Sequence, residues 1–270
     1  MTQRPLILAT NDDGIEAPGL WHLAEAVSHF ADVIIVAPAF NQSAMSAAVT
    51  LRRDLESERA YSRLPGVDAW QVNGTPTDAV VHGLRHFAPR HVDMVVSGVN
   101  PGPNVGREIL HSGTVMAAMQ GYLRGLPSVA ASLSSFDDDH LLDAAIVAGR
   151  IAERLLASGQ HHLLNVNVPD LDISEYQGVR VAAMADMAVS RVVDITGEHG
   201  STRRKLEFLP DVDVVPDTDV AAIMDGAVAV TPLHNDFTLY SALSDTSTLI
   251  GDRDSLTTER ADARADSDVN

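Results

Sequence analysis

Cysteine is absent from the 270-residue sequence, which excludes a disulfide framework, a thiolate metal site and a cysteine nucleophile. Aromatic residues are scarce at 4%, so the expected core is built mainly from Ala, Val, Ile and Leu. No apolar run approaches the ~20 residues that a membrane-spanning helix needs. The apolar stretch near the start is too short for a signal peptide. Together these absences predict a cytoplasmic protein with no membrane segment.

Basic residues are also few, because 19 Lys and Arg stand against 37 Asp and Glu, a formal net charge of −18. Nucleic-acid backbones and anionic membranes bind clustered basic side chains, so both are disfavoured as partners. A small phosphorylated substrate stays compatible, because a bound divalent cation reverses the local sign of charge. The G-x-G-x-x-G and G-x-x-x-x-G-K-[ST] motifs are missing, which argues against a dinucleotide-dependent dehydrogenase and a P-loop enzyme.

Over the first 170 residues, apolar runs alternate with amphipathic ones. Buried strands are predicted at 5–11, 32–38, 69–73, 92–100, 127–133 and 162–170, and helices at 17–30, 75–87, 112–125 and 139–158. Strands that alternate with helices are typical of a parallel sheet covered on both faces. The sequence therefore predicts an α/β core over residues 1–170.

After residue 170 the pattern changes to strands without long helices between them. We predict a strand-rich C-terminal part over 171–250, with a charged excursion at 197–219 and a strand at 226–233 that returns to the core. The excursion is either an arm that leaves the core or a mobile loop. Residues 251–270 are polar and mostly acidic, and we expect a disordered tail there.

Polar side chains follow the predicted strands at their carboxyl ends, where open parallel sheets bind ligands. They are Asn11, Asp12 and Asp13 after the first strand, Asn41, Gln42, Ser43 and Ser46 after the second, and Ser97, Asn100 and Asn104 after 92–96. Adjacent acids repel unless a positive group lies between them. Oxygen ligands suit a hard cation such as Mg²⁺ or Mn²⁺. The plain alternative for each residue by itself is a cap or a turn position.

Two Gly-Thr turns precede predicted helices and form a second candidate element. Ser112, Gly113 and Thr114 stand where one helix begins, and Gly74 and Thr75 precede another. A helix N-terminus presents free N–H groups and partial positive charge, which suit a phosphate. Each turn taken singly is also a common N-cap.

Several segments together resemble one known family. "LATNDDGIEAPGL", "VAPAFNQSAMS", "NGTPTDAVVHG", "VVSGVNPGPNVG" and "HSGTVMAAM" occur in the order and spacing of the SurE family, the survival-protein nucleotidases, and "LLNVNVPD" and "VAVTPLH" extend the likeness. The resemblance spans about residues 5–240. It implies a Rossmann-like core and a divalent-metal-dependent 5′/3′-nucleotidase acting on nucleoside monophosphates, sometimes with activity on short polyphosphate. It also implies a homodimer or homotetramer that exchanges C-terminal segments, with 197–219 as the subunit-linking arm.

The same resemblance implies particular site residues. The metal ligands would be Asp12, Asp13, Ser43 and Asn100, and the phosphate pocket would be lined by Asn11, Gly74, Thr75, Asn104, Ser112, Gly113 and Thr114. The sequence also departs from the family pattern. Ala39 and Phe40 stand where Asp-Arg is usual, and Ala44 stands where Gly usually follows the Ser.

The expected reaction is attack of water on a phosphomonoester, with one cation per subunit. Asp12 or Asp13, whichever is less engaged with the metal, would accept the proton of the water. Ser112 and Thr114 would orient the phosphate. The alternative is a non-catalytic nucleotide-binding or regulatory protein that uses the same pocket.

Overall fold

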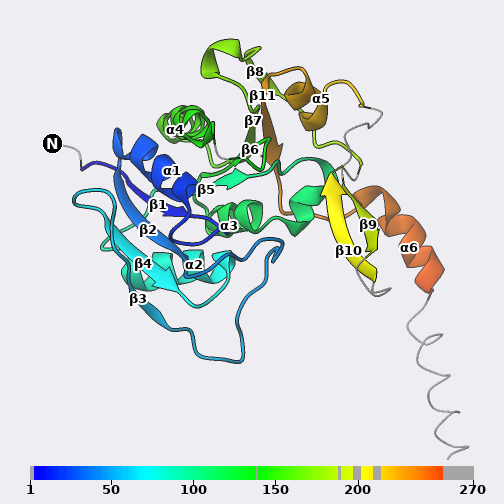
Figure 1. Cartoon of the computed structure of the whole chain (residues 1–270). Coiled ribbons are helices and arrows are strands. Elements are labelled where there is room, and N and C mark those ends of the chain that lie inside the picture. The colour runs from blue at the N-terminus through cyan, green and yellow to red at the C-terminus, as the bar shows by residue number, and fades with distance from the viewer. Residues whose placement is uncertain (1–2, 138, 188–189, 197–201, 209–213, 252–270) are drawn as a thin grey trace, which may run out of the picture. The chain divides into compact units, whose positions relative to one another are not determined.

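One large sheet forms the centre of the computed structural model, which describes residues 3–137, 139–187, 190–196, 202–208 and 214–251 (Figure 1). Its strands are β1 (Leu6–Thr10), β2 (Asp32–Pro38), β3 (Ser57–Arg59), β4 (Asp68–Val72), β5 (Met94–Pro101), β6 (Ser128–Leu133), β7 (Leu163–Val168), β8 (Val179–Val181) and β11 (Val228–Leu233). They are hydrogen-bonded in the order β3-β4-β2-β1-β5-β6-β7-β11-β8. From β4 to β7 every neighbouring pair is parallel.

Helices cover both faces of this sheet. They are α1 (Pro18–Ser28), α2 (Pro76–His82) with a π-helical turn at Gly83–Phe87, α3 (Gly113–Tyr122), α4 (Leu141–Ser158) and α5 (Asp219–Met224), with 3-10 turns at Gly106–His111 and Ile173–Glu175. A separate antiparallel hairpin pairs β9 (Ser190–Thr196) with β10 (Thr202–Phe208). This first unit ends at His234. The second unit, 235–270, contains a 3-10 turn at Tyr240–Ala242 and α6 (Leu243–Ile250).

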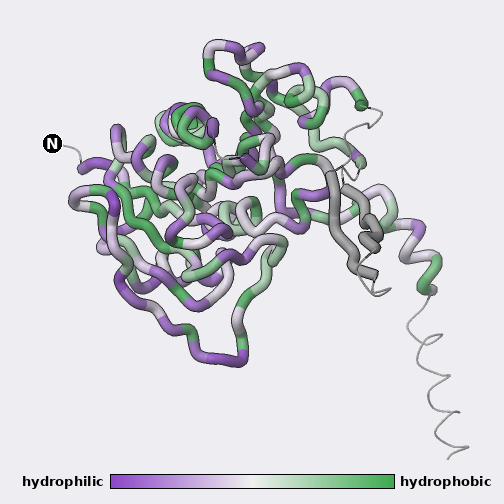
Figure 2. The backbone as a smooth tube through the Cα atoms, in the orientation of Figure 1, coloured by the Kyte–Doolittle hydropathy of each residue, from purple (hydrophilic) through white to green (hydrophobic). Residues whose placement is uncertain are grey.

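The core divides into two layers because successive strand residues point to opposite faces. In β1, Ile7 and Ala9 pack in the layer that includes α1 and α4, whereas Leu6 and Leu8 pack in the layer that includes α2. Every residue of β1 is buried, as expected for a central parallel strand. Figure 2 accordingly shows hydrophobic colour along the inner strands.

The predicted α/β fold with a mostly parallel sheet is confirmed. The bounds of the six core strands agree with those expected from the sequence to within two residues. The short strand β3 was missed, because its three residues are all exposed and carry no apolar pattern. At the other edge, β11 runs antiparallel to β7 and parallel to β8.

The C-terminal predictions have mixed outcomes. The segment predicted to return to the core does so as β11, between β7 and β8. Part of the predicted excursion, 202–208, is β10 of the hairpin, whereas 197–201, 209–213 and the predicted tail from 252 lie outside the described residues. The division of the sequence at residues 170 and 250 stays a prediction. No helix in the described part of the chain is long and apolar enough to span a bilayer.

The sheet has a topological switch point at β1, where successive strands of the chain are added first on one side and then on the other. From β1 the chain first adds β2 and then β4 on one side, and later adds β5, β6 and β7 on the other side. In open α/β sheets the loops at such a reversal diverge and leave a crevice at the carboxyl ends of the strands. The crevice expected from this topology lies between the loops that follow β1 and β5.

Candidate functional site

Asp12 lies two residues after the end of β1 and is 3% exposed. Its Oδ1 accepts a hydrogen bond from the hydroxyl of Thr114 at the start of α3. Burial raises the pKa of the Asp12 carboxyl, while the hydrogen bond from the Thr114 hydroxyl and bonds to the backbone, including Gly113 and Thr114, oppose the rise. Asp12 is therefore a buried acid held in one orientation by a helix N-terminus.

Asp13 has one engaged oxygen and one free oxygen. Its Oδ1 accepts a hydrogen bond from Asn41 Nδ2 at 3.2 Å, while its buried Oδ2 has no hydrogen-bond partner among the described residues. Burial, reinforced by the negative charge of Asp12, raises the pKa of Asp13 from 3.8 to about 7. A buried carboxylate oxygen without a donor is unfavourable. The electrostatics of the pair therefore suit a positively charged ligand.

The raised pKa predicts how the stability of the metal-free protein depends on pH. Asp13 keeps its proton in the folded state at pH values where the unfolded chain has lost it, so stability falls as pH rises from about 4 to about 7. For one proton retained in the folded state, the unfolding free energy falls by up to about 1.4 kcal/mol per pH unit. With EDTA present, the gain in unfolding free energy from Asp13→Asn should grow over this range. Urea titrations at several pH values measure it, and parallel profiles for the two proteins would contradict it.

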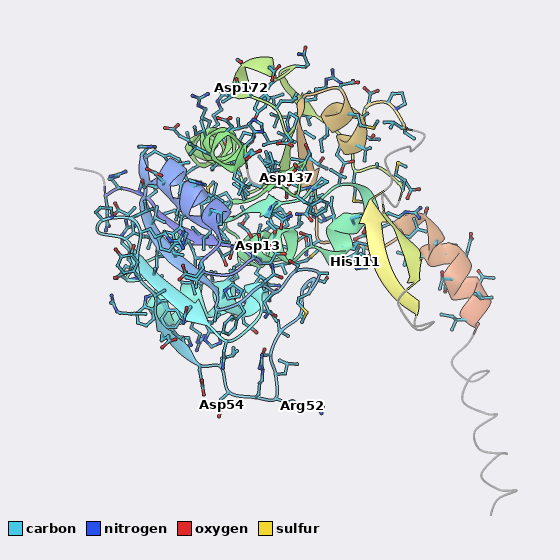
Figure 3. All side chains as sticks on the ribbon, viewed as in Figure 1. Asp13, Arg52, Asp54, His111, Asp137 and Asp172 are labelled. Atoms are coloured by element: carbon cyan, nitrogen blue, oxygen red, sulfur yellow. The ribbon has the colours of Figure 1, made fainter. Side chains whose placement is uncertain are left out.

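The loop after β2, residues 39–50, connects these carboxylates with the other candidate segments. Several hydrogen bonds hold this loop against other segments. They include bonds from Gln42 N to Asp12 O (2.7 Å), from Ser46 Oγ to Leu110 O (2.7 Å), from Thr75 Oγ1 to Ala48 O (2.6 Å) and from Thr50 Oγ1 to Asp78 Oδ2 (2.7 Å). The loop also holds two non-glycine residues in the left-handed region, Ala44 at φ 62° and Ser46 at φ 52°. In Figure 3, Arg52 and Asp54 lie farther along the chain, far from Asp13.

The start of α3 contacts Asp12 closely. Ser112 caps the helix by accepting a hydrogen bond from Val115 N at 3.1 Å, and Thr114 donates to Asp12. A Cβ added to Gly113 would lie 2.7 Å from the Asp12 Cβ and 2.8 Å from its Oδ2. Glycine is therefore required here by the close approach of the carboxylate. Of the three residues predicted from the helix start, Gly113 and Thr114 contact Asp12, and Ser112 caps the helix next to them.

Asn11 and Asn104 are held by neighbouring polar groups. Asn11 exchanges two hydrogen bonds with the backbone of Gly14, at 2.9 and 3.2 Å, and so closes the turn that carries the acids. The side-chain N–H of Asn104 donates a hydrogen bond to Ser132 Oγ at 2.8 Å. Its backbone N–H donates to Asn167 Oδ1, also at 2.8 Å. Its carbonyl oxygen accepts from Asn165 and Asn167.

These partners of Asn104 were missed by the sequence reasoning. Asn165 and Asn167 are 0% exposed and lie on β7, where they alternate with apolar residues in "LLNVNV". A buried polar side chain in a central strand needs hydrogen-bond partners. The two asparagines in this strand were therefore the available signal that a polar loop packs against it.

Gly74 and Thr75 are placed by a capping box at the start of α2. Thr75 Oγ1 accepts from Asp78 N, and an Asp78 carboxylate oxygen accepts from Thr75 N at 3.0 Å. The same carboxylate accepts from the backbone and the hydroxyl of Thr50. Asp78, which the sequence reasoning also missed, thereby fixes the loop 39–50 against α2.

Asp78→Ala should lower the unfolding free energy by about 3 kcal/mol at pH 7, because three donors lose a buried charged acceptor. Hydrogen bonds from Thr75 and Thr50 outweigh burial and lower the pKa of Asp78, so its contribution is present above pH 3.8 and is lost as pH falls further. Urea denaturation measures the change. Asp68→Ala, which breaks an exposed ion pair with Arg59, serves as a control with an expected loss below about 1 kcal/mol.

Ser43 and Asn100 lie on the loops around the acidic pair without being bonded to it. Ser43 is exposed, and its backbone N–H donates to Asn41 Oδ1 at 2.9 Å. The side-chain N–H groups of Asn100 donate hydrogen bonds to the carbonyl oxygens of Pro101 and Gly102. Its Oδ1 is therefore the atom that could bind a cation. In the described part of the chain, no hydrogen bond joins either residue to Asp12 or Asp13.

The donor set fits a hard cation. No group of three His, Cys, Asp or Glu side chains in the described ranges is placed to hold a metal. A cation at the Asp12–Asp13 pair would therefore complete its coordination with neutral oxygens, which Mg²⁺ and Mn²⁺ accept and zinc sites seldom use. The buried free Oδ2 of Asp13 is the observation that supports such a site.

This fold and this site define a Rossmann-like α/β protein with an acidic, oxygen-lined centre at the switch in strand order. The family model "Survival protein SurE" matches residues 7–191. The chain belongs to the SurE family, as the sequence motifs predicted.

Relatives in this family match most of the chain. It is 36% identical to a "5′-nucleotidase SurE" of Heliobacterium modesticaldum, over 91% of this chain and 92% of the relative. It is 41% identical to a "5′/3′-nucleotidase SurE" of Salmonella arizonae, over 87% and 92%. Among solved structures, the SurE protein of Aquifex aeolicus superimposes with a TM-score of 0.80 at 32% identity, covering 92% of this chain and all of the other.

Proposed function

We propose that this protein is a 5′/3′-nucleotidase, which hydrolyses nucleoside 5′- and 3′-monophosphates to nucleoside and phosphate. The buried Oδ2 of Asp13, which has no hydrogen-bond partner in the described part of the chain, carries the proposal, because it is an acceptor at the edge of the sheet where open α/β folds bind ligands. The names of the relatives, which match 87% to 91% of the chain, support the same activity.

The proposal includes one divalent cation per subunit, Mg²⁺ or Mn²⁺, held by Asp12, Asp13, Ser43 and Asn100. When bound, it would supply positive charge that offsets the phosphate and the two acids and that makes water more acidic. Such a centre makes an anionic substrate compatible with the net charge of −18, because the cation reverses the sign of charge locally.

The side chains around the cation would accept the water proton and hold the phosphate. Thr114 holds Asp12 in one orientation through Oδ1, so Asp13 is the better proton acceptor, through the oxygen that does not hold the cation. The water oxygen bonds to phosphorus as the ester P–O bond breaks, one water proton passes to Asp13, and the departing nucleoside oxygen takes a proton from solvent water to become the free hydroxyl. Asn11, Asn104, Ser112, Gly113 and Thr114, with Gly74 and Thr75 across the anchored loop, would surround the phosphate.

Turnover of AMP, GMP and their 3′ isomers, measured with Mg²⁺, with Mn²⁺ and with EDTA, tests the proposal. We expect metal-dependent release of phosphate from both isomer classes. Binding of these nucleotides without any turnover would contradict it and favour a non-catalytic nucleotide-binding protein.

We further propose that the protein works as a homodimer or homotetramer that exchanges C-terminal segments. The support is the β9–β10 hairpin, which pairs with itself and stands outside the main sheet. Deletion of 199–214 should lower the native mass in light scattering, and an unchanged mass would contradict the exchange.

A further inference from the structure

A hollow of about 390 Å³ opens at the edge of the sheet formed by β3 and β4. Its lining residues are Ala39, Phe40, Glu56, Ser57, Glu58, Gln71 and Asn73. Two of them, Ala39 and Phe40, begin the loop that contacts the acidic pair. The hollow and the acids therefore share one loop.

Phe40 is fixed close to Asp13 by contacts on both sides. Its backbone packs on Gly14, where an added Cβ would lie 3.1 Å from the Phe40 carbonyl carbon. The next residue, Asn41, donates to the Asp13 carboxylate. The preceding residue, Ala39, is bonded to Val72 O at 2.8 Å. The side chain of Phe40 is nevertheless 77% exposed, so its ring is available to a ligand.

The chemistry of the hollow selects against a phosphate. Two carboxylates, Glu56 and Glu58, and no cationic side chain are among its seven lining residues. Such a lining repels anions and accepts hydrogen bonds from N–H groups. Gln71 Nε2 already donates to Glu58, which adds an oriented amide to the wall. A neutral, flat group with N–H donors at its edge fits these features.

We propose that Phe40 and this hollow form the subsite for the purine base of the nucleotide substrate. The base stacks on the Phe40 ring, its N–H groups face Glu56 and Glu58, and the phosphate lies at Asp12 and Asp13. All nucleobases carry N–H donors at the edge, and purines are favoured among them because their larger ring system gives more stacking area. This inference rests on the proposed nucleotidase function and deepens it.

Comparison of purine nucleotides with ribose 5-phosphate, which has no base, tests the subsite. In Phe40→Ala, the ratio of kcat/KM for GMP or AMP to kcat/KM for ribose 5-phosphate should fall about five- to a hundred-fold, the effect of losing one stacked base. Phe40→Tyr should retain the ratio. Tyr61→Ala, which removes an aromatic side chain that is 85% exposed and outside the hollow, is the matched control with an unchanged ratio.

A binding measurement without turnover completes the test. In Phe40→Trp, guanosine should quench tryptophan emission beyond the response of the parent protein, whose Trp21 and Trp70 lie outside the hollow's lining. Equal losses for GMP and ribose 5-phosphate in Phe40→Ala would overturn the subsite and make Phe40 a residue that positions the loop. A changed native mass of Phe40→Ala would overturn it by assigning the ring to a subunit contact. If the parent protein hydrolyses no phosphate ester, the nucleotidase proposal fails, and guanosine quenching then decides the subsite separately.

Discussion

Replacing either Asp12 or Asp13 by Asn should lower kcat/KM for nucleoside monophosphates by about 10²–10⁴, while the protein still folds. The size of the loss is that of removing a positioned proton acceptor, or a charged ligand of the proposed cation. The substitution is nearly isosteric, and relief of repulsion between the two buried acids should raise stability without metal. Phosphate release and thermal unfolding measure the two effects.

Metal-dependent thermal stabilisation should shrink in the same two variants, because it reports binding to the native state. Asp54→Asn removes the same charge from a residue that lies far from Asp13 in Figure 3, and it should change neither quantity. Two results would refute the mechanism. One is undiminished metal-dependent turnover by Asp12→Asn, and the other is a trapped aspartyl-phosphate, since the proposed reaction has no covalent intermediate.

Gly113→Ala should reduce turnover about as severely as loss of Asp12 itself. The new Cβ would lie 2.7 Å from the Asp12 Cβ, a distance that forces the carboxylate or the helix to move. A displacement near 1 Å in an active site costs on the order of 10²-fold in rate. Alanine at the first turn of a helix is otherwise favourable, so the change acts through the contact with Asp12.

A double-mutant cycle distinguishes displacement of Asp12 by the new methyl group from a disturbance of helix α3 as a whole. If Gly113→Ala acts by displacing Asp12, it should add little further loss in the Asp12→Asn background. Independent, additive losses in kcat/KM would show that the alanine disturbs α3 itself. Circular dichroism of the single variant provides the check that the helix is intact.

The parts of this protein that were predictable from sequence are those where one local signal decides the structure. The apolar run at residues 6–9, which is followed three residues later by the pair Asp12 and Asp13, predicts a central strand that ends in a polar site. The cap at Ser112 likewise follows from residue type. Both features were anticipated, although the roles of these residues in the site remain predictions.

Long-range pairing decided the parts that were missed. Nothing local in Asn165 or Asn167 says that their amides bond to Asn104, about sixty residues earlier in the chain. The role of Asp78 depends on Thr50, 28 residues away, and the exposed strand β3 forms because β4 is there to pair with it. Alanine disfavours the positive φ of Ala44, so its residue type gave no signal, and only the glycine that is usual at this position in the family pointed to that conformation.

The buried carboxylate of Asp219 has a consequence for synthesis of the chain. Asp219 is 0% exposed and accepts from the backbone N–H of Gly106, 113 residues earlier. Gly106 follows the loop of Asn104, so the support of this loop is incomplete until Asp219 has left the ribosome. At 5–20 residues per second the delay is on the order of ten seconds. During that interval β7 also lacks β11, and its open edge is exposed to other nascent chains.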